Sequence, residues 1–165
     1  MTQRRPAKSP GRDECADMYR LCLSTNLRRT ERLVTRHYDA HLAPAGVTAV
    51  QFPMLAIIGS AEEATVRLIA SQLDLDRSTL SRNLALLASR GLVVMGPPAG
   101  PKPATLSLTA KGRQTLRRAY GLWLDAHAAL EAALSKDAVS GGLEFLKTLR
   151  HGARELPAAR ASSKR

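Results

Sequence analysis

The sequence predicts a mainly α-helical protein with one small β-hairpin, organised as two lobes. Most apolar residues recur at i+3 or i+4, which is the spacing of residues on one face of a helix. Two short apolar segments, residues 92–95 and 105–108, flank a segment rich in Pro and Gly, a pattern typical of a hairpin. The first and last helical segments are long and carry apolar stripes, which favours a separate helical lobe.

Composition limits the class of protein. The 165 residues are 44% hydrophobic, enough for one domain with tails, and 25 Lys and Arg against 14 Asp and Glu give a net charge of +11. This charge predicts a polyanionic partner, such as nucleic acid or an anionic membrane surface, unless it reflects an Arg-rich genome. The chain has no apolar run near the ~20 residues of a membrane span and no secretory signal. With two cysteines and no disulfide framework, we expect a cytoplasmic protein without a membrane partner.

The ends of the chain differ from its middle. Residues 1–12 and 157–165 are basic and lack periodicity, so we expect a disordered basic arm and a disordered tail. Residues 13–42 have helical periodicity throughout and predict one long helix that ends at Ala43–Pro44–Ala45–Gly46. A helix this long cannot bury its stripes against one small core, which indicates a dimerisation or scaffold role.

Two shorter helices follow. Thr48 and Gln51 have the spacing of a capping box, so the second helix is expected from about Ala49 to Gly59. Because Pro53 is awkward in that helix, a start near Phe52 or a distorted first turn is the alternative. Thr65 is expected to cap a third helix over residues 66–73, which a short turn at residues 74–76 joins to the next helix. Helix, short turn and helix in this order predict a helix-turn-helix, although its turn lacks the usual Gly.

The next helix is expected from Asp76, a good N-cap residue, to Gly91, and it has two different faces. Leu80, Leu84 and Leu87 form an apolar stripe at i, i+4 and i+7. The opposite face is small, polar and basic: Ser78, Ser81, Arg82, Ala85 and Ser89. Short hydroxyls and an arginine suit the major groove of DNA, because Arg can bind guanine with both arms and small side chains allow close approach. An ordinary solvated amphipathic helix is the alternative for this segment alone.

A hairpin directly after a helix-turn-helix predicts a wing. Residues 92–95 and 105–108 are its expected strands, and GPPAGPKP is its loop. Thr109 is expected to cap a long helix to about Leu134, and Ser135 a final helix over 136–156, with a break or kink favoured at Gly141–Gly142. The predicted organisation is a winged helix-turn-helix at residues 48–109 and a helical dimerisation region at residues 13–47 and 110–156.

Over about residues 15–153 the chain resembles the MarR family of winged helix-turn-helix regulators. The matching segments are LAPAGVTAVQF, LDLDRSTLSRNLALLASRGLV and LSLTAKGR. The resemblance implies a homodimer whose first and last helices interlock and whose recognition helices enter major grooves about 34 Å apart on a pseudo-palindromic site in double-stranded DNA. It also implies a sequence-specific transcriptional regulator, most often a repressor.

The resemblance assigns DNA contacts to individual residues. Ser78, Thr79 and Arg82 are expected at or near base edges, and Arg77 and Ser81 at phosphates. The wing departs from the family pattern, which has an Asp–Arg pair at the tip. Here Lys102 is the only cation in the loop, so it is expected to contact a phosphate as a point charge, and specificity is expected mostly from the recognition helix.

The usual input of the family is a small aromatic or phenolic ligand held between the dimer helices and the DNA-binding lobe. The polar or aromatic residues available for such a pocket are Arg36, His37, Tyr38, His41 and Trp123. For each of them, an ordinary surface or core position is the alternative.

A thiol is the second possible input. MYRLCLSTNL resembles the first helix of the organic-peroxide-sensing branch, which makes Cys22 a candidate redox sensor. On one continuous helix, Cys15 and Cys22 would face the same way about 10.5 Å apart, too far for a disulfide, which needs Cα atoms within about 7 Å. The C-terminal half contains no resolving cysteine, and inert packing in the interior is the alternative for Cys22.

Other classes of function find no support in the sequence. It contains no Gly-rich phosphate loop, nucleophile elbow or paired metal-ligand spacing, so we expect no enzyme activity, no metal and no cofactor. An architectural DNA-binding protein without an effector remains an alternative, and its mark would be a steep salt dependence with little sequence preference.

Overall fold

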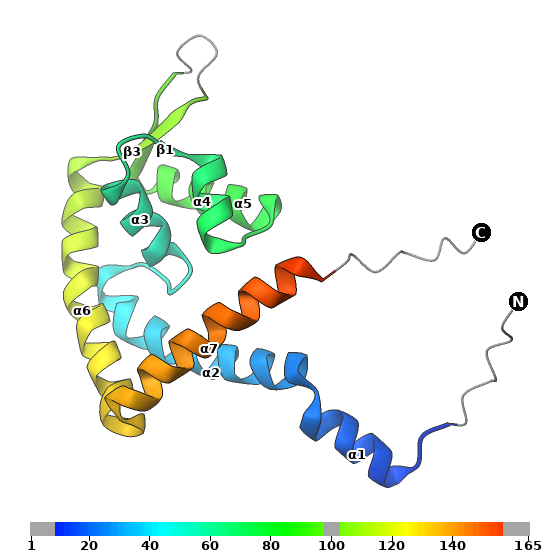
Figure 1. Ribbon diagram of the computed structural model, residues 1–165. Coiled ribbons are helices and arrows are strands. Elements are labelled where there is room, and N and C mark those ends of the chain that lie inside the picture. The colour runs from blue at the N-terminus through cyan, green and yellow to red at the C-terminus, as the bar shows by residue number, and fades with distance from the viewer. Residues whose placement is uncertain (1–8, 98–102, 157–165) are drawn as a thin grey trace, which may run out of the picture.

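The computed structural model describes residues 9–97 and 103–156 and confirms a mainly helical fold with a small antiparallel sheet (Figure 1). The helices are α1 Arg12–Leu21, α2 Leu23–Leu42, the 3₁₀ turn η1 Ala43–Ala45, α3 Gln51–Ser60, α4 Val66–Leu73, α5 Arg77–Ser89, α6 Ala110–Leu134 and α7 Lys136–Glu155. The strands are β1 Ala64–Thr65, β2 Val93–Met95 and β3 Thr105–Leu108, in the sheet order β1-β3-β2.

The prediction of one helix over residues 13–42 was wrong. The backbone of Cys22 is extended, with φ −67° and ψ 108°, and this residue separates α1 from α2. The side-chain amide of Asn26 donates to the carbonyl oxygens of Arg20 at 2.9 Å and Cys22 at 3.0 Å. The first bond gives a partner to the carbonyl of Arg20 in the last turn of α1, and the carbonyl of Cys22 also accepts from the backbone N–H of Asn26 at 3.1 Å, so Asn26 connects the two sides of the break.

The helix caps lie where the sequence predicts them. The side-chain oxygens of Thr65, Asp76, Thr109 and Ser135 each accept a hydrogen bond from the backbone N–H three residues later, at 2.9–3.2 Å. Thr48 Oγ1 likewise accepts from the N–H of Gln51 at 3.3 Å. Helix α3 begins at Gln51 rather than at Ala49, so Pro53 lies in the first turn, where its missing N–H is not needed.

The core lies between helices α3, α4 and α5, the sheet and the first half of α6. It contains Leu42, Met54, Leu55, Ile69, Leu80, Leu87 and Leu92, which are at most 1% exposed. Helix α6 approaches the sheet closely at Gly112, where a Cβ atom would lie 2.0 Å from the carbonyl oxygen of Leu92. The core therefore fixes both α5 and the wing strands relative to α6.

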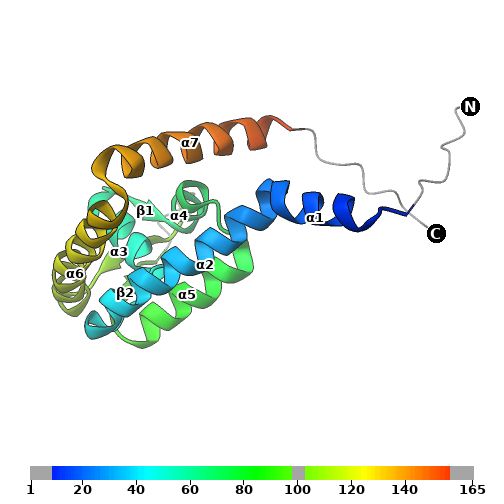
Figure 2. The same ribbon diagram turned by 90° about the horizontal axis from the view of Figure 1, so that it is seen from below.

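Helices α1 and α7 contain no buried residue. Helix α1 extends away from the rest of the chain in both views, whereas α7 runs from the end of α6 back toward the helix-turn-helix (Figures 1 and 2). Leu21 is 75% exposed, and Leu143 and Phe145 are 58% and 55% exposed. Helix α7 runs through Gly141 and Gly142 as one helix, so the chain has no break there.

Candidate nucleic-acid interface

Helices α4 and α5 form the predicted helix-turn-helix. Asp74 ends α4 in the left-handed conformation, with φ 50° and ψ 36°, and its N–H donates to the carbonyl of Ala70. Asp adopts this conformation more readily than most residues because its short side chain bonds locally. This explains how the turn forms without the Gly that is usual there.

Helix α5 presents the two faces expected from the sequence. Leu80, Leu84 and Leu87 are 1%, 6% and 0% exposed and attach the helix to the core. All members of the polar stripe are exposed: Ser78, Ser81, Arg82, Ala85 and Ser89. Because the apolar stripe is buried, the position of this polar face relative to the body is fixed by packing.

Asp76 organises the N-terminal turn of α5. One of its carboxylate oxygens accepts hydrogen bonds from the Ser78 hydroxyl at 2.6 Å and the Thr79 N–H at 2.9 Å, and the other accepts from the Thr79 hydroxyl at 2.7 Å. Bonds from Ser78 and then Thr79 hold the pKa of Asp76 far below its usual range. Ser78 is exposed, whereas Thr79 is half-buried.

Arginine 67 is a candidate contact that sequence reasoning missed. It lies in the first turn of α4 and is exposed. Together with Arg77 it lines a depression of about 540 Å³ between the N-terminal ends of α4 and α5 and the base of the wing at Pro103. Arg67 could have been predicted as a phosphate contact from the sequence, because it lies two residues after the Thr65 cap. The N-terminal end of a helix and an arginine side chain both attract phosphates.

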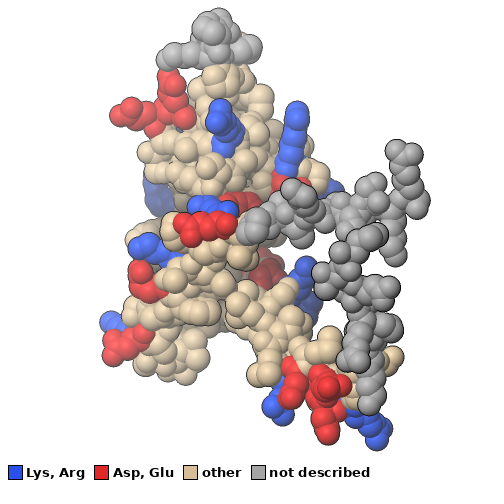
Figure 3. Space-filling model, turned by 45° about the vertical axis from the view of Figure 1, so that its right-hand side comes forward, with Lys and Arg blue, Asp and Glu red and all other residues tan. Residues whose placement is uncertain are grey.

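The wing is formed by β2 and β3, which pair antiparallel with Val94 opposite Ser107. It protrudes beyond the helices (Figure 1). The predicted contact Lys102 lies outside the described residues. On the face drawn in Figure 3, basic and acidic side chains are interspersed rather than gathered in one basic patch.

A second feature is a cavity of about 590 Å³ between α2, α3, α4, α6 and α7, which we call the effector cavity. Of the five predicted ligand contacts, Tyr38 and Trp123 line it. Sequence reasoning missed the other lining residues: Leu42, Ala49, Phe52, Pro53, Ala56, Ile57, Gln72, Leu73, His127 and Leu143. The rings of Phe52 and His127 stack on Trp123 with centroids 6.1 and 5.2 Å away, so one wall is aromatic.

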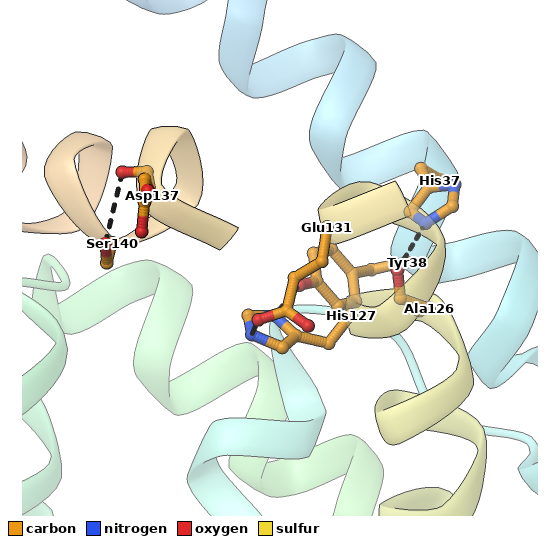
Figure 4. A network of polar contacts seen from close by, with 7 residues as sticks. All are labelled: His37, Tyr38, Ala126, His127, Glu131, Asp137 and Ser140. Carbon is orange, nitrogen blue, oxygen red and sulfur yellow. Dashed lines mark hydrogen bonds and ion pairs between the residues drawn. The ribbon is translucent and has the colours of Figure 1, made fainter. Parts of the chain in front are cut away.

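A short polar relay enters this cavity from α2 and α6. The Tyr38 hydroxyl lies 3.3 Å from Nδ1 of His127, whose Nε2 lies 3.7 Å from Glu131 (Figure 4). Burial raises the pKa of Tyr38, so its phenol stays protonated. Together with Gln72, Tyr38 and His127 give polar atoms to a lining that is otherwise apolar or aromatic.

The other predicted ligand contacts do not line the effector cavity. His37 Nε2 lies 2.9 Å from the carbonyl of Ala126, and His41 Nδ1 lies 2.9 Å from the carbonyl of His37. Arg36 donates to the carbonyl of Arg32, outside this cavity. His37 connects α2 to α6, and the contact of His41 lies within α2. Both histidines therefore help to position α2 as a wall of the cavity.

Both cysteines are exposed in this chain, which contradicts the interpretation of Cys22 as interior packing. Cys22 is the N-cap residue of α2. Hydrogen bonds from Thr25, and a weaker one from Ser24, lower the pKa of its thiol. Cys15 lies in α1 and Cys22 lies at the break between α1 and α2. The distance of about 10.5 Å expected for two cysteines on one continuous helix therefore does not apply.

A helix-turn-helix followed by a β-hairpin, with a polar helix face held outward, defines the winged helix-turn-helix class. A family model described as "MarR family" matches residues 45–102. Solved structures match a larger part of the chain, and they include a relative 31% identical over 98% of its length. The chain therefore belongs to the MarR family of transcriptional regulators.

Three solved structures illustrate the similarity. The transcriptional regulator MosR of M. tuberculosis in complex with DNA is 31% identical, covers 81% of this chain and has a TM-score of 0.70. The transcriptional repressor CouR bound to p-coumaroyl-CoA is 29% identical, with 84% of this chain and 96% of CouR covered and a TM-score of 0.74. A mutant MarR of E. coli complexed with operator DNA is 26% identical, with 81% and 96% covered and a TM-score of 0.71. No curated protein sequence matches the chain.

The described part of the chain also bears on two other classes of protein, membrane-spanning and metal-binding ones. None of its helices combines the length and the apolar character that crossing a bilayer requires. Its His, Cys, Asp and Glu side chains form no group of three or more with the geometry to hold a metal ion.

Proposed function

We propose that this regulator is a homodimeric repressor that binds a pseudo-palindromic operator in double-stranded DNA and is released by a small aromatic or phenolic ligand. The two faces of α5 are the main support for DNA binding. Three buried leucines fix the helix to the core, and its exposed face presents Arg82 between short side chains. Such a face allows close approach to base edges in a major groove.

Individual roles follow from position. Arg82 and Ser78 are assigned to base edges, and Arg77 and Ser81 to phosphates. Thr79 is assigned to the edge of the contact, because it is half-buried and bonded to Asp76. Arg67 joins Arg77 as a phosphate contact, and Lys102 is assigned to a phosphate next to the wing.

The dimer is proposed from residues 13–47 and 110–156. Helices α1 and α7 expose apolar side chains that the single chain leaves in water. Burial of apolar surface contributes about 25 cal/mol per Å², so a second copy that covers both helices would be strongly stabilised. A two-fold dimer of winged helix-turn-helix lobes explains why a pseudo-palindromic operator is expected.

The test of sequence-specific binding is fluorescence anisotropy at fixed salt, with DNA from upstream of the protein's own gene and random DNA. Arg82→Ala should cost about 1–3 kcal/mol on the specific site and much less on random DNA. Arg118→Ala, which removes an exposed arginine from α6, is the control. If wild type shows a steep salt dependence and no preference for any genomic site, the chain is an architectural DNA-binding protein instead.

The effector part of the proposal rests on the effector cavity. Its volume of about 590 Å³ lies within the 300–1,000 Å³ typical of small-molecule sites, and its lining combines aromatic rings with the Tyr38–His127 pair. The relative CouR is described as bound to p-coumaroyl-CoA, which supports an aromatic or phenolic ligand here. Tyr38 and Trp123 are the proposed contacts, His37 and His41 position α2, and Arg36 lies outside the site.

Release by 4-hydroxycinnamate tests this part. Added to the protein–operator complex, it should lower the anisotropy, and Leu143→Trp should abolish the effect by filling the effector cavity. Glu144→Gln, which changes the next residue on the exposed surface of α7, should respond as wild type does. Release that persists in Leu143→Trp would place the effector elsewhere.

A thiol input is the second candidate, because Cys22 is exposed at the N-terminal end of α2 and its pKa is lowered. Its thiolate would attack an organic hydroperoxide, so that an S–O bond forms, the O–O bond breaks, and the alcohol leaves after taking a proton from water. Peroxide should then release DNA from wild type and Cys15→Ser but not from Cys22→Ser. Equal release from both variants would exclude Cys22 as the sensor.

A further inference from the structure

The chain holds a second cavity of about 600 Å³ on the other side of Phe52 and Ala56, which line both cavities. It lies between the C-terminal end of α3, strand β3 and the first half of α6, and we call it the wing-base cavity. Its lining residues that matter here are Ser60, Glu62, Leu108, Arg113, Arg117 and Tyr120. We propose that the wing-base cavity binds a small organic anion with an apolar, preferably aromatic, body: an aryl carboxylate.

The floor of the wing-base cavity is apolar. Strand β3 contributes Leu106 and Leu108, both buried, and α6 contributes Leu116. At Gly59, a Cβ atom would lie 3.0 Å from Leu108 Cδ1 and 3.1 Å from Leu116 Cδ2, so the absence of a side chain lets α3 approach this floor. An apolar ligand body would cover surface that water covers in the free chain.

The wall of the wing-base cavity is aromatic. The ring of Tyr120 is 54% exposed and stacks on Trp123 with the centroids 6.0 Å apart. Trp123 in turn stacks on Phe52. These rings are held by one another, so they offer a preformed stacking surface at low entropic cost.

The rim of the wing-base cavity has a net positive charge. Arg113 is held in place because its Nη1 donates to the carbonyl of Leu108 at 2.7 Å. Arg117 follows one turn later on α6, and within the described residues it makes no hydrogen bond or ion pair. Glu62 is the single carboxylate of the lining, so two guanidinium groups face one carboxylate. Guanidinium groups bind carboxylates with two parallel hydrogen bonds, which selects an anion.

Occupancy of the wing-base cavity would act on the wing. A bound ligand would contact Leu106, Ser107 and Leu108 of β3, which pair with all three residues of β2. The site is separate from the effector cavity and its existence does not depend on the proposed effector or on DNA binding.

Isothermal titration calorimetry of the full chain tests the proposal, with 4-hydroxycinnamate as the anion and 4-hydroxycinnamyl alcohol as its neutral counterpart. Wild type should bind two anions per chain, one in each cavity, but only one alcohol. Leu143→Trp should remove the site in the effector cavity and leave the second site intact. The titration therefore distinguishes two negative results: absence of binding in the effector cavity and absence of binding in the wing-base cavity.

Two variants address the second site directly. Arg117→Gln should weaken it about tenfold, since a charge-assisted bond is lost, and Ser60→Phe should abolish it by filling the cavity. Arg118→Gln removes the neighbouring charge, which does not line the cavity, and should bind as wild type does. A single site that Leu143→Trp removes, or a second site that is insensitive to both Arg117→Gln and Ser60→Phe, would overturn the proposal, as would equal weakening by Arg118→Gln.

Discussion

Asp76 shows how one residue can serve both the fold and the proposed interface. Its carboxylate caps α5 and holds the hydroxyls of Ser78 and Thr79, while all three side chains lie at the end of the helix that carries Arg82. The acidic side chain would repel phosphates, but as a cap it complements the positive end of the helix dipole. Its local bonds orient the two hydroxyls before any DNA is bound.

The lowered pKa of Asp76 predicts a pH dependence of stability. A depressed pKa means that the ionised form is favoured by folding, so its contribution is complete at neutral pH. The contribution is lost as the pH falls below about 4, the pKa of an unfolded Asp, toward the lower folded value. Asp76→Asn should therefore lower the Tm at pH 7, and the difference from wild type should shrink in acid.

Thermal unfolding at pH 7 and pH 3 measures this, with Asp137→Asn as the control. Asp137 lies in the first turn of α7, and its side chain makes no hydrogen bond or ion pair to another described residue. A difference between wild type and Asp76→Asn that stays constant from pH 7 to pH 3 would contradict the role assigned to the carboxylate.

Gly112 gives a second prediction at the residue scale. Alanine has the higher helix propensity by about 1 kcal/mol, so Gly112→Ala would stabilise α6 if propensity decided. A Cβ atom at this position would instead lie 2.0 Å from the backbone oxygen of Leu92, which no side-chain rotation relieves. We expect a net loss of at least about 2 kcal/mol in the free energy of unfolding, within the range known for overpacking.

Urea unfolding measures this difference. Gly121→Ala is the matched control, because it lies in the same helix and a Cβ atom there would meet nothing within 4 Å. That variant should be stabilised by about 0.5–1 kcal/mol. If Gly112→Ala were as stable as Gly121→Ala, the close approach of α6 to the sheet would be wrong.

At the scale of elements, the sequence predicted those helices whose ends carry a chemical signal. Thr65, Asp76 and Thr109 each stand before an apolar period, and α4, α5 and α6 begin directly after them. The break at Cys22 could not be predicted, because no Pro or Gly lies there. It is stabilised by the side-chain amide of Asn26, four residues later. Strand β1 was missed because two residues have no periodicity, and its existence depends on pairing with β3.

Among the described residues, an ion pair joins helix α7 to the turn of the helix-turn-helix. Arg154 Nη2 lies 2.6 and 2.8 Å from the two carboxylate oxygens of Asp74, in the turn between α4 and α5. The side chains are 61% and 48% exposed, so water and salt screen the interaction. A double-mutant cycle with Asp74→Asn and Arg154→Gln should give a coupling of about 0.2–1 kcal/mol.

Urea unfolding at 0.1 M and 1 M NaCl measures this coupling, which should fall at the higher salt. The pair of Lys147 and Glu144, spaced i,i+3 on the same helix, provides a reference cycle for an exposed ion pair within one helix. A coupling of zero at low salt would mean that α7 is not held at the turn.

At the scale of the whole molecule, most residues that line the effector cavity could not be predicted from the sequence. Tyr38 and Trp123 were named because the family resemblance implies a ligand pocket and they are aromatic residues available to line it. His127 was not among the predicted contacts, because its contact with Tyr38 crosses 89 positions of the chain and depends on how α2 packs on α6. The excess of positive charge predicted a polyanionic partner, but its distribution over the surface follows from the fold (Figure 3).

The proposed dimer yields the last prediction. Leu146 lies on the apolar side of α7 with Leu143, Leu149 and Ala153, and none of them is buried in the single chain. If a second copy covers this face, Leu146→Glu removes a contribution of about 1.5–3 kcal/mol and places a charge in an apolar interface. The dissociation constant of the dimer should then rise at least about tenfold, and operator affinity should fall with it, because one recognition helix at a time reaches only a half-site.

Sedimentation equilibrium and anisotropy on the same samples measure the two effects. Thr148→Glu is the matched control, since it places the same charge on the polar side of α7. The two measurements also test whether dimer dissociation causes the loss of DNA binding. If it does, excess Leu146→Glu protein should restore operator binding, because a higher concentration restores the dimer. A variant that stays dimeric at every concentration would show that α7 contributes nothing to the interface, and the exposed leucines would then need another partner.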